Sequence, residues 1–196
     1  MPDRPNLDPS RTALLVMDYQ PGILARLADA DAVTARAAAA IDAVRRHGGT
    51  IGYVRVAFTE ADVAAMPETS GMGVAARAGG EAFHADNPLT AVDERVAPRP
   101  GDVVVRKVRV GAFSTTDLDE QLRERGVDTL ILAGISTSGV LLSTVRDAYD
   151  RDYRVLVLSD ASADPDPEVH AFLVERVFGR QAQVIEVAEL DALLGQ

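Results

Sequence analysis

An uninterrupted apolar run, Ala13-Leu14-Leu15-Val16-Met17, ends at Asp18 near the start of the chain. Similar apolar runs follow, and the stretches between them have the pattern of helices. The expected strands cover 13–17, 51–56, 102–105, 129–133, 154–158 and 183–185, and the expected helices cover 32–47, 117–125, 138–151, 167–178 and 187–194. Strands without alternating polar residues are buried on both faces. The sequence therefore predicts an α/β protein with a parallel sheet between two helical layers, a three-layer α/β/α sandwich.

The stretch 58–99 departs from this pattern, because it is long, contains several glycines and has weak periodicity. Segments of this kind often form lids or binding loops. The alternative is a surface excursion that contains a short helix. No internal repeat and no linker is visible, so we expect one domain over residues 1–196.

The composition narrows the chemistry and the partners. The chain has no cysteine, which excludes disulfides, thiolate metal sites and cysteine nucleophiles. Lys107 is the only lysine among 20 basic residues, and the net charge is −10. An acidic chain without a basic cluster is a poor nucleic-acid binder, and no apolar run approaches the roughly 20 residues of a membrane span. No secretory signal follows Met1, so we expect a cytoplasmic protein without nucleic-acid or membrane partners.

Two charged residues occupy the ends of expected strands, where open α/β sheets bind their ligands. Asp18 directly follows the first strand and suits a general acid or base whose pKa depends on burial and a nearby cation. The alternative is a turn or N-cap residue near Pro21. Lys107 follows the third strand, where an ammonium group holds a carboxylate ionised or stabilises developing negative charge. The alternative is a strand-end lysine that extends to water.

The turn Gly134–Val140 lies between the fourth strand and a helix. Its backbone N–H groups form a candidate anion or oxyanion site, because a helix N-terminus leaves such groups unpaired. Ser138 is also a natural N-cap residue, and as a nucleophile it would need a base within reach. The three histidines lack the spacing of metal ligands. We therefore expect neither a metal nor a cofactor.

Three stretches together resemble the motifs of the isochorismatase-like hydrolases of the cysteine hydrolase superfamily. Residues 13–20 (ALLVMDYQ) resemble the first motif, residues 107–118 (KVRVGAFSTTDL) the lysine motif, and residues 134–148 (GISTSGVLLSTVRDA) the third motif. Their order and spacing fit the family over nearly the whole chain. The resemblance implies a small-molecule substrate, a six-stranded, mainly parallel, Rossmann-like sheet of order 3-2-1-4-5-6, and a homo-oligomer, either dimer or tetramer.

The resemblance also implies a catalytic site. In this family an aspartate deprotonates a cysteine thiol, a lysine stabilises the charged pair, and the thiolate attacks an amide or similar carbon. Asp18 and Lys107 match the aspartate and the lysine, and Val140 occupies the cysteine position. The family's non-proline cis peptide bond would lie at Ile135–Ser136, with the backbone N–H groups of Ser136 and Val140 as oxyanion donors.

Val140 changes what the resemblance implies about the reaction, because valine forms no covalent intermediate. True isochorismatases cleave a vinyl ether without a thiol: the aspartate protonates the enol-ether carbon, and water adds to the oxocarbenium ion. That reaction needs Asp18 protonated, hence a raised pKa in an apolar pocket. Those enzymes carry Trp-Arg-Tyr after the lysine, where residues 108–110 are Val-Arg-Val. A chorismate-like pocket is therefore not indicated.

Three hypotheses remain open from the sequence. The first is a hydrolase without a cysteine nucleophile, with Asp18 as general acid/base and Lys107 as its electrostatic partner. The second is an inactive member that binds a small molecule or serves as a structural or regulatory subunit. The third is a hydrolase with Ser136 or Ser138 as nucleophile. We expect substrate contacts from Tyr19, Gln20, Arg55, Phe58, Phe113 and Ser138.

Overall fold

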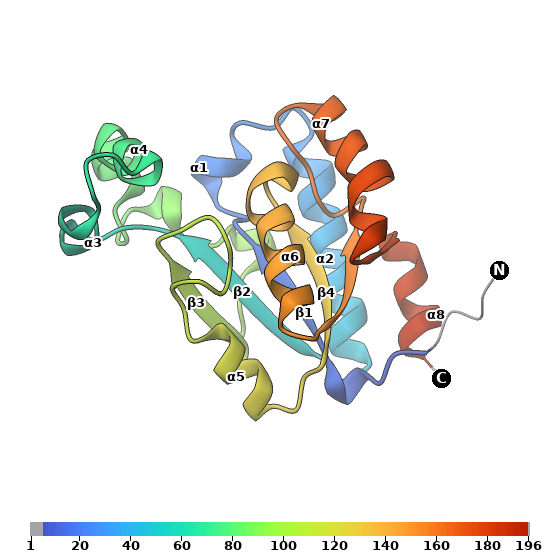
Figure 1. Cartoon of the computed structure of the whole chain (residues 1–196). Helices are drawn as coiled ribbons and strands as arrows, with labels where there is room; N and C mark the ends of the chain where they lie inside the picture. Colours follow the sequence, from blue (N-terminus) through green and yellow to red (C-terminus); the bar gives the residue numbers. More distant parts are fainter. Residues whose placement is uncertain (1–5, 196) are drawn as a thin grey trace.

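Six parallel strands form the centre of the molecule in the computed structural model, which describes residues 6–195 (Figure 1). The strands are β1 Thr12–Met17, β2 Thr50–Val56, β3 Val103–Lys107, β4 Thr129–Gly134, β5 Arg154–Leu158 and β6 Gln183–Ile185. They lie in the order β3-β2-β1-β4-β5-β6, and each neighbouring pair is parallel. The predicted fold class and strand order are confirmed.

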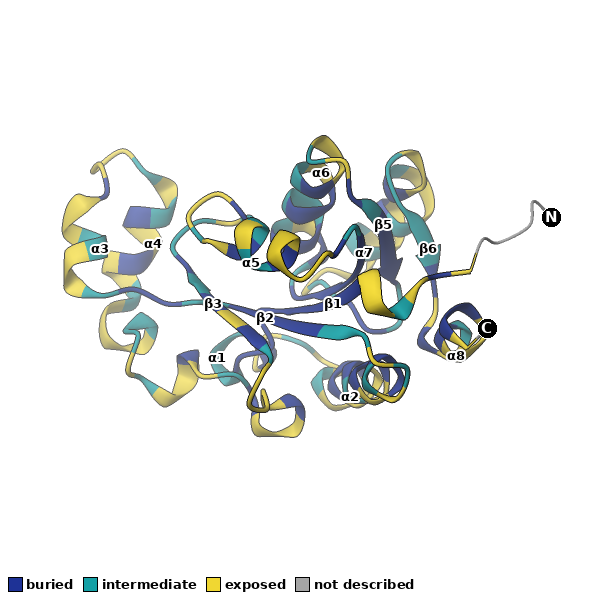
Figure 2. Cartoon of the chain, turned by 90° about the horizontal axis from the view of Figure 1, so that it is seen from below, coloured by how far each residue is buried: buried dark blue, intermediate teal, exposed yellow. Residues whose placement is uncertain are grey.

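Helices cover both faces of this sheet (Figure 2). The α-helices are α1 Pro21–Leu24, α2 Ala30–Arg46, α3 Glu60–Ala65, α4 Gly71–Gly79, α5 Leu118–Glu124, α6 Leu142–Asp150, α7 Pro167–Phe172 and α8 Leu190–Leu194. α2 and α8 lie on one face, and α5, α6 and α7 on the other. A π-helical turn, Thr137–Leu141, begins one residue before the predicted helix 138–151, and a second, Leu173–Val177, lies within the predicted helix 167–178. Short 3₁₀ turns cover Pro9–Arg11, Gly80–Phe83, Pro88–Thr90, Glu94–Val96, Phe178–Arg180 and Val187–Glu189.

The apolar runs form strands because each face of the sheet has its own core. In β1, Leu14 and Val16 pack in the cluster that contains α2 and α8. Leu15 and Met17 pack in the cluster on the opposite face, with α5 and α6. Each fully buried side chain of this size stabilises the fold by about 1.5–3 kcal/mol, so positions 13–17 of the strand favour apolar residues.

The stretch 58–99, called the excursion below, is largely helical and extends beyond the β3 edge of the sheet (Figure 1). It contains α3, α4 and three 3₁₀ turns, more structure than one short helix. Phe58, Met66 and Ala76 form a small apolar cluster inside it. Phe58 holds the excursion together, since its N–H donates to Phe83 O at 2.9 Å and its carbonyl accepts from Ala85 N at 2.8 Å. Among residues 6–195 no helix is long and apolar enough to cross a membrane.

Candidate active site

Asp18 directly follows β1, as predicted, and is 4% exposed. Its φ of +61° lies in the left-handed region, which most side chains avoid but aspartate and asparagine tolerate best. Its N–H donates to Val54 O of β2 at 2.8 Å. Non-glycine residues in this conformation are frequent at functional sites, so Asp18 is a candidate catalytic residue.

Lys107 is the last residue of β3 and reaches Asp18 across β2. Its Nζ lies 2.8 Å from Asp18 Oδ2 and donates to Val110 O, also at 2.8 Å. Lys107 is only 2% exposed, so it is not a strand-end lysine that extends to water. The structure thus brings the only lysine of the chain against the candidate acid.

The second carboxyl oxygen of Asp18, Oδ1, is buried and has no hydrogen-bond partner among residues 6–195. Burial raises the pKa of Asp18 from 3.8 to about 6, because it disfavours the charged form, and the ammonium of Lys107 opposes this rise. Such a carboxyl group exchanges a proton near neutral pH, which is the property a general acid or base needs.

The turn after β4 supplies the third part of the site. The Ile135–Ser136 peptide bond is cis, at the position the resemblance implies. Ser136 and Val140 line the same cavity as Asp18 and Lys107. Val140 is buried and packs closely against Gly134: a Cβ atom added to Gly134 would lie only 3.2 Å from Cγ1 of Val140. Val140, to which the resemblance assigns the cysteine position, is therefore a tightly packed apolar side chain.

These residues line a cavity of about 260 Å³ at the carboxyl end of the sheet. Its walls are mostly apolar, and the excursion provides part of them. The lining residues are Asp18, Ile23, Arg26, Val56, Phe58, Met72, Ala75, Ala76, Phe83, Lys107, Val110, Ile135, Ser136, Gly139, Val140 and Pro165. A few polar groups in an apolar cavity are typical of small-molecule sites. In the described part of the chain no group of three or more acidic or histidine side chains is arranged to hold a metal ion.

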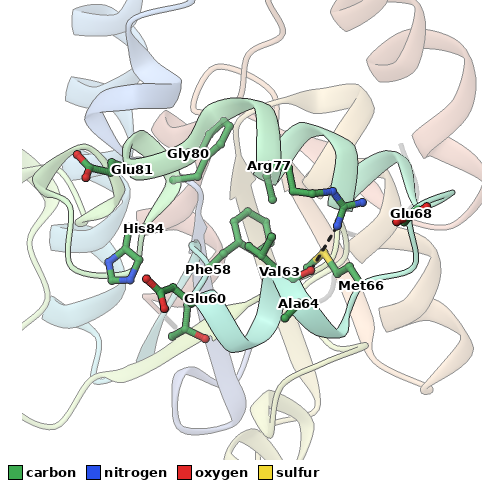
Figure 3. A pocket seen from close by; sticks show the side chains of 13 residues that line it. Phe58, Glu60, Val63, Ala64, Met66, Glu68, Arg77, Gly80, Glu81 and His84 are labelled. Carbon is green, nitrogen blue, oxygen red and sulfur yellow. Dashed lines mark hydrogen bonds between the residues drawn. The ribbon is translucent and has the colours of Figure 1, made fainter.

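A second, larger pocket of about 580 Å³ lies within the excursion (Figure 3). Phe58, Ala76 and Phe83 line both cavities and separate them. Figure 3 shows the hydrogen bond that the guanidinium group of Arg77 donates to the carbonyl of Val63. The carboxylate of Glu60 lies on the side of the pocket where His84 lies. We place the candidate active site in the smaller cavity, because that one contains the buried acid and its cation.

Two of the expected substrate contacts are instead engaged in the framework. Tyr19 is 1% exposed, and its hydroxyl donates to Ala161 O. Gln20 is also buried, and its amide accepts from Val56 N at 2.8 Å and donates to Thr90 O at 2.7 Å. Neither residue lines the cavity of Asp18. Gln20 ties the end of β1 to β2 and to the excursion.

Of the other expected contacts, only Phe58 lines the cavity. Arg55 donates to two backbone carbonyls of the excursion at 3.1 Å. Phe113 is buried and stacks on Tyr153, with ring centroids 6.0 Å apart. Ser138 is exposed, and its hydroxyl donates to Asp164 at 2.6 Å. The structure therefore brings together Asp18, Lys107, Ser136, Val140 and Phe58, and leaves these other predicted contacts outside the lining.

Several residues of the cavity lining are not among the site residues expected from the sequence. Arg26 follows α1, and Met72, Ala76 and Phe83 belong to the excursion. None of them lies at the end of a strand or in one of the three motif stretches. Their places in the cavity come from long-range packing, for which the sequence carries no short motif.

The raised pKa of Asp18 makes stability depend on pH. The folded state binds this proton more tightly than the unfolded state, so the resulting stabilisation is fully present below pH 3.8 and is lost as pH rises through about 6. For a shift of about two pKa units the loss is about 3 kcal/mol. Asp18→Asn has no such proton to lose. Urea unfolding near pH 4 and pH 7 should show a larger fall in unfolding free energy for the native protein than for the variant, and equal changes would contradict the shift.

Comparisons with known proteins agree with this architecture. The sequence matches the isochorismatase domain family over residues 12–189. It is 37% identical to a probable isochorismatase of Pseudomonas chlororaphis, covering 94% of this chain and 87% of that one. It is 31% identical to the ureidoacrylate amidohydrolase RutB of Methylobacterium radiotolerans, covering 100% and 85%. The solved structure of an isochorismatase family protein from Burkholderia thailandensis superimposes with a TM-score of 0.83 at 30% identity, covering 98% and 99%.

The matches cover nearly the whole chain. Together with the parallel sheet of this strand order, they define the architecture of the cysteine hydrolase superfamily. Within it, the chain belongs to the isochorismatase family of small-molecule hydrolases.

Proposed function

We propose that the protein hydrolyses a small molecule by general acid–base catalysis at Asp18, with Lys107 as electrostatic partner and without a cysteine nucleophile. One observation carries the proposal: a buried carboxyl oxygen, Asp18 Oδ1, has no partner among residues 6–195, belongs to a residue that lines a cavity, and is part of a group with a pKa of about 6. An unpaired buried polar atom is costly unless a ligand or a proton satisfies it.

The reaction that fits this group best is the hydrolysis of a vinyl ether. The protonated carboxyl of Asp18 gives its proton to the enol-ether carbon, and the double-bond electrons form the new C–H bond. Water adds to the resulting oxocarbenium ion and releases a proton, and the hemiketal collapses to a carbonyl compound and an alcohol. Lys107 stabilises the carboxylate that Asp18 becomes, and the proton released from water restores the acid.

Of the two relatives named above, the probable isochorismatase supports cleavage of a vinyl ether, and the ureidoacrylate amidohydrolase supports cleavage of an amide. The probable isochorismatase is 37% identical and the ureidoacrylate amidohydrolase is 31% identical to this chain. Amide hydrolysis through a thiolate needs a nucleophile that Val140 lacks. Vinyl-ether hydrolysis needs only an acid and water, both of which this site accommodates. The Val-Arg-Val sequence after Lys107 favours a substrate other than one with a chorismate-like ring.

Hydrolysis in D₂O tests this chemistry directly. With small enol ethers that lack a chorismate-like ring as substrates, we expect one deuterium on the protonated carbon of the carbonyl product, seen by mass spectrometry. We also expect no covalent enzyme intermediate when the reaction is quenched in acid. A product without carbon-bound deuterium, or a protein mass increased by a substrate fragment, would contradict the proposal.

Val140 also favours a second candidate, a catalytically inactive member that binds a small molecule or serves as a structural or regulatory subunit. In that case no enol ether is turned over. Val140→Cys then restores the family's three residues, and we expect it to create amidase activity that Val140→Ser lacks. Turnover of an enol ether by the native protein, lost in Asp18→Asn, would exclude this candidate.

A serine nucleophile is the third candidate. Ser138 is exposed and bonded to Asp164, and Ser136 lines the cavity without a hydrogen bond to any histidine or carboxylate of the described chain. A serine-directed phosphonate should therefore leave the protein mass unchanged. Labelling of Ser136 or Ser138 would support this candidate instead.

A further inference from the structure

Arg26 is the third charged residue of the cavity lining, besides Asp18 and Lys107. It follows α1, and its backbone N–H donates to Ile23 O at 3.0 Å. Its side chain is exposed, and it forms no ion pair with any residue in the range 6–195. The ammonium of Lys107, by contrast, is held by Asp18 and by Val110 O. Arg26 therefore brings an uncommitted guanidinium group to the cavity.

Other arginines at this end of the sheet are already engaged. Arg55 donates to two carbonyls of the excursion, and Arg106 pairs with Asp62 at 2.7 Å. Arg109 donates to the carbonyl of Val108 at 2.7 Å. A guanidinium group has five donors in a planar fork that matches a carboxylate. Among residues 6–195, Arg26 is thus the one arginine that lines this cavity, and its donors are the ones placed for a ligand there.

The charge of the cavity selects the sign of that ligand. When Asp18 is protonated, the lining contains two positive charges, Lys107 and Arg26, and no negative one. The chain as a whole has a net charge of −10. When Asp18 is ionised the lining still has one net positive charge. The cavity is therefore a local positive site on an acidic protein, and an anion gains there from this charge.

We infer that Arg26 binds a carboxylate of the substrate, so that the substrate class is a small, largely apolar carboxylate. This inference rests on the proposed function only for the place of the site, and not for the bond that is cleaved. Arg26 acts here as a specificity residue, while Asp18 carries the proton. Because a charge-assisted pair discriminates against a neutral isostere, we expect carboxylates to bind at least about tenfold more tightly than the matching amides.

Calorimetric titration with benzoate and benzamide tests the inference. The native protein should bind benzoate at least about tenfold more tightly than benzamide. Arg26→Gln should lose this preference, and Arg26→Lys should keep part of it. Arg46→Gln removes an arginine that pairs with Asp191 and serves as the matched control, since it changes the net charge equally without touching the cavity. It should behave as the native protein does.

Three results would overturn the inference. The first is that the native protein does not bind benzoate at millimolar concentration. The second is that Arg26→Gln keeps the preference for benzoate over benzamide, and the third is that Arg46→Gln loses this preference as much as Arg26→Gln does. Asp18→Asn separates this inference from the proposed function. If it binds benzoate at least as tightly as the native protein but hydrolyses no substrate, the acid acts as proposed and Arg26 is judged by its own variants. If it hydrolyses substrate normally, the proposed function is wrong whatever Arg26 binds.

Discussion

Asp18→Asn is expected to lower kcat/KM about a thousandfold, because a positioned general acid or base contributes roughly 10²- to 10⁴-fold to a reaction rate. Asparagine has nearly the same shape as aspartate and tolerates the φ of +61° at this position. It carries no exchangeable carboxyl proton. The loss should therefore be in the chemical step, visible as a lower kcat at saturating substrate.

Asp152→Asn is the matched control for this change. Asp152 has the same φ of +61° and lies outside the cavity lining, so its replacement should leave kcat/KM within twofold of the native value. Circular dichroism should show both variants folded, because the asparagine side chain in Asp18→Asn still offers an oxygen to Lys107. Native activity in a folded Asp18→Asn protein would refute the assignment of Asp18 as the acid.

Lys107→Met is expected to move the pH profile upwards and to lower kcat about a hundredfold. The ammonium of Lys107 lowers the pKa of Asp18 and opposes the effect of burial, so its removal raises that pKa above about 6. A general acid is active while protonated, and activity falls as pH rises through its pKa. The descending limb should therefore shift to higher pH by at least about one unit, since an opposite charge at this distance shifts a carboxyl pKa by 1–3 units.

The lower kcat has a separate cause: without Lys107, the carboxylate left after proton transfer has no cation beside it. Methionine retains most of the buried stem, which limits the loss of packing. Arg106→Met is the control, because Arg106 precedes Lys107 in β3 but pairs with Asp62. Its pH profile should match that of the native protein. A descending limb that stays in place in Lys107→Met would show that the ion pair does not set the pKa of Asp18.

The fold was predictable because its central strands, β1 and β4, are buried on both faces. In β1 successive side chains enter two different cores, so the run contains no polar residue before Asp18. The same burial made the end of β1 easy to locate, and with it Asp18. The strand that holds Lys107 extends two residues beyond the predicted end at residue 105 and keeps the lysine in the sheet.

The surroundings of the acid were harder to predict, since a place at a strand end does not fix where a side chain points. Tyr19 and Gln20 follow Asp18 directly, yet both are buried in the framework. The left-handed backbone at Asp18 redirects the chain at this point, and apolar periodicity carries no information about such a turn.

The excursion had local signals that its weak periodicity obscured. Thr59 and Asp62 form a capping box at the start of α3, and Ser70 caps α4. These two short helices pack mainly on a small cluster rather than on the main core, so little apolar periodicity is needed to hold them. Arg26 had no signal of this kind. It reaches the cavity only because α1 and the excursion border the same space.

A carbon-13 NMR titration of the Asp18 carboxyl group tests most directly whether this residue is an acid poised near neutral pH. The Asp18 resonance is identified by its absence from the spectrum of Asp18→Asn. We expect a titration midpoint of about 6, because burial raises the pKa of Asp18 from the ordinary 3.8. A midpoint at or below 3.8 would mean that Asp18 stays ionised beside Lys107 throughout the neutral range, and would contradict its role as a general acid.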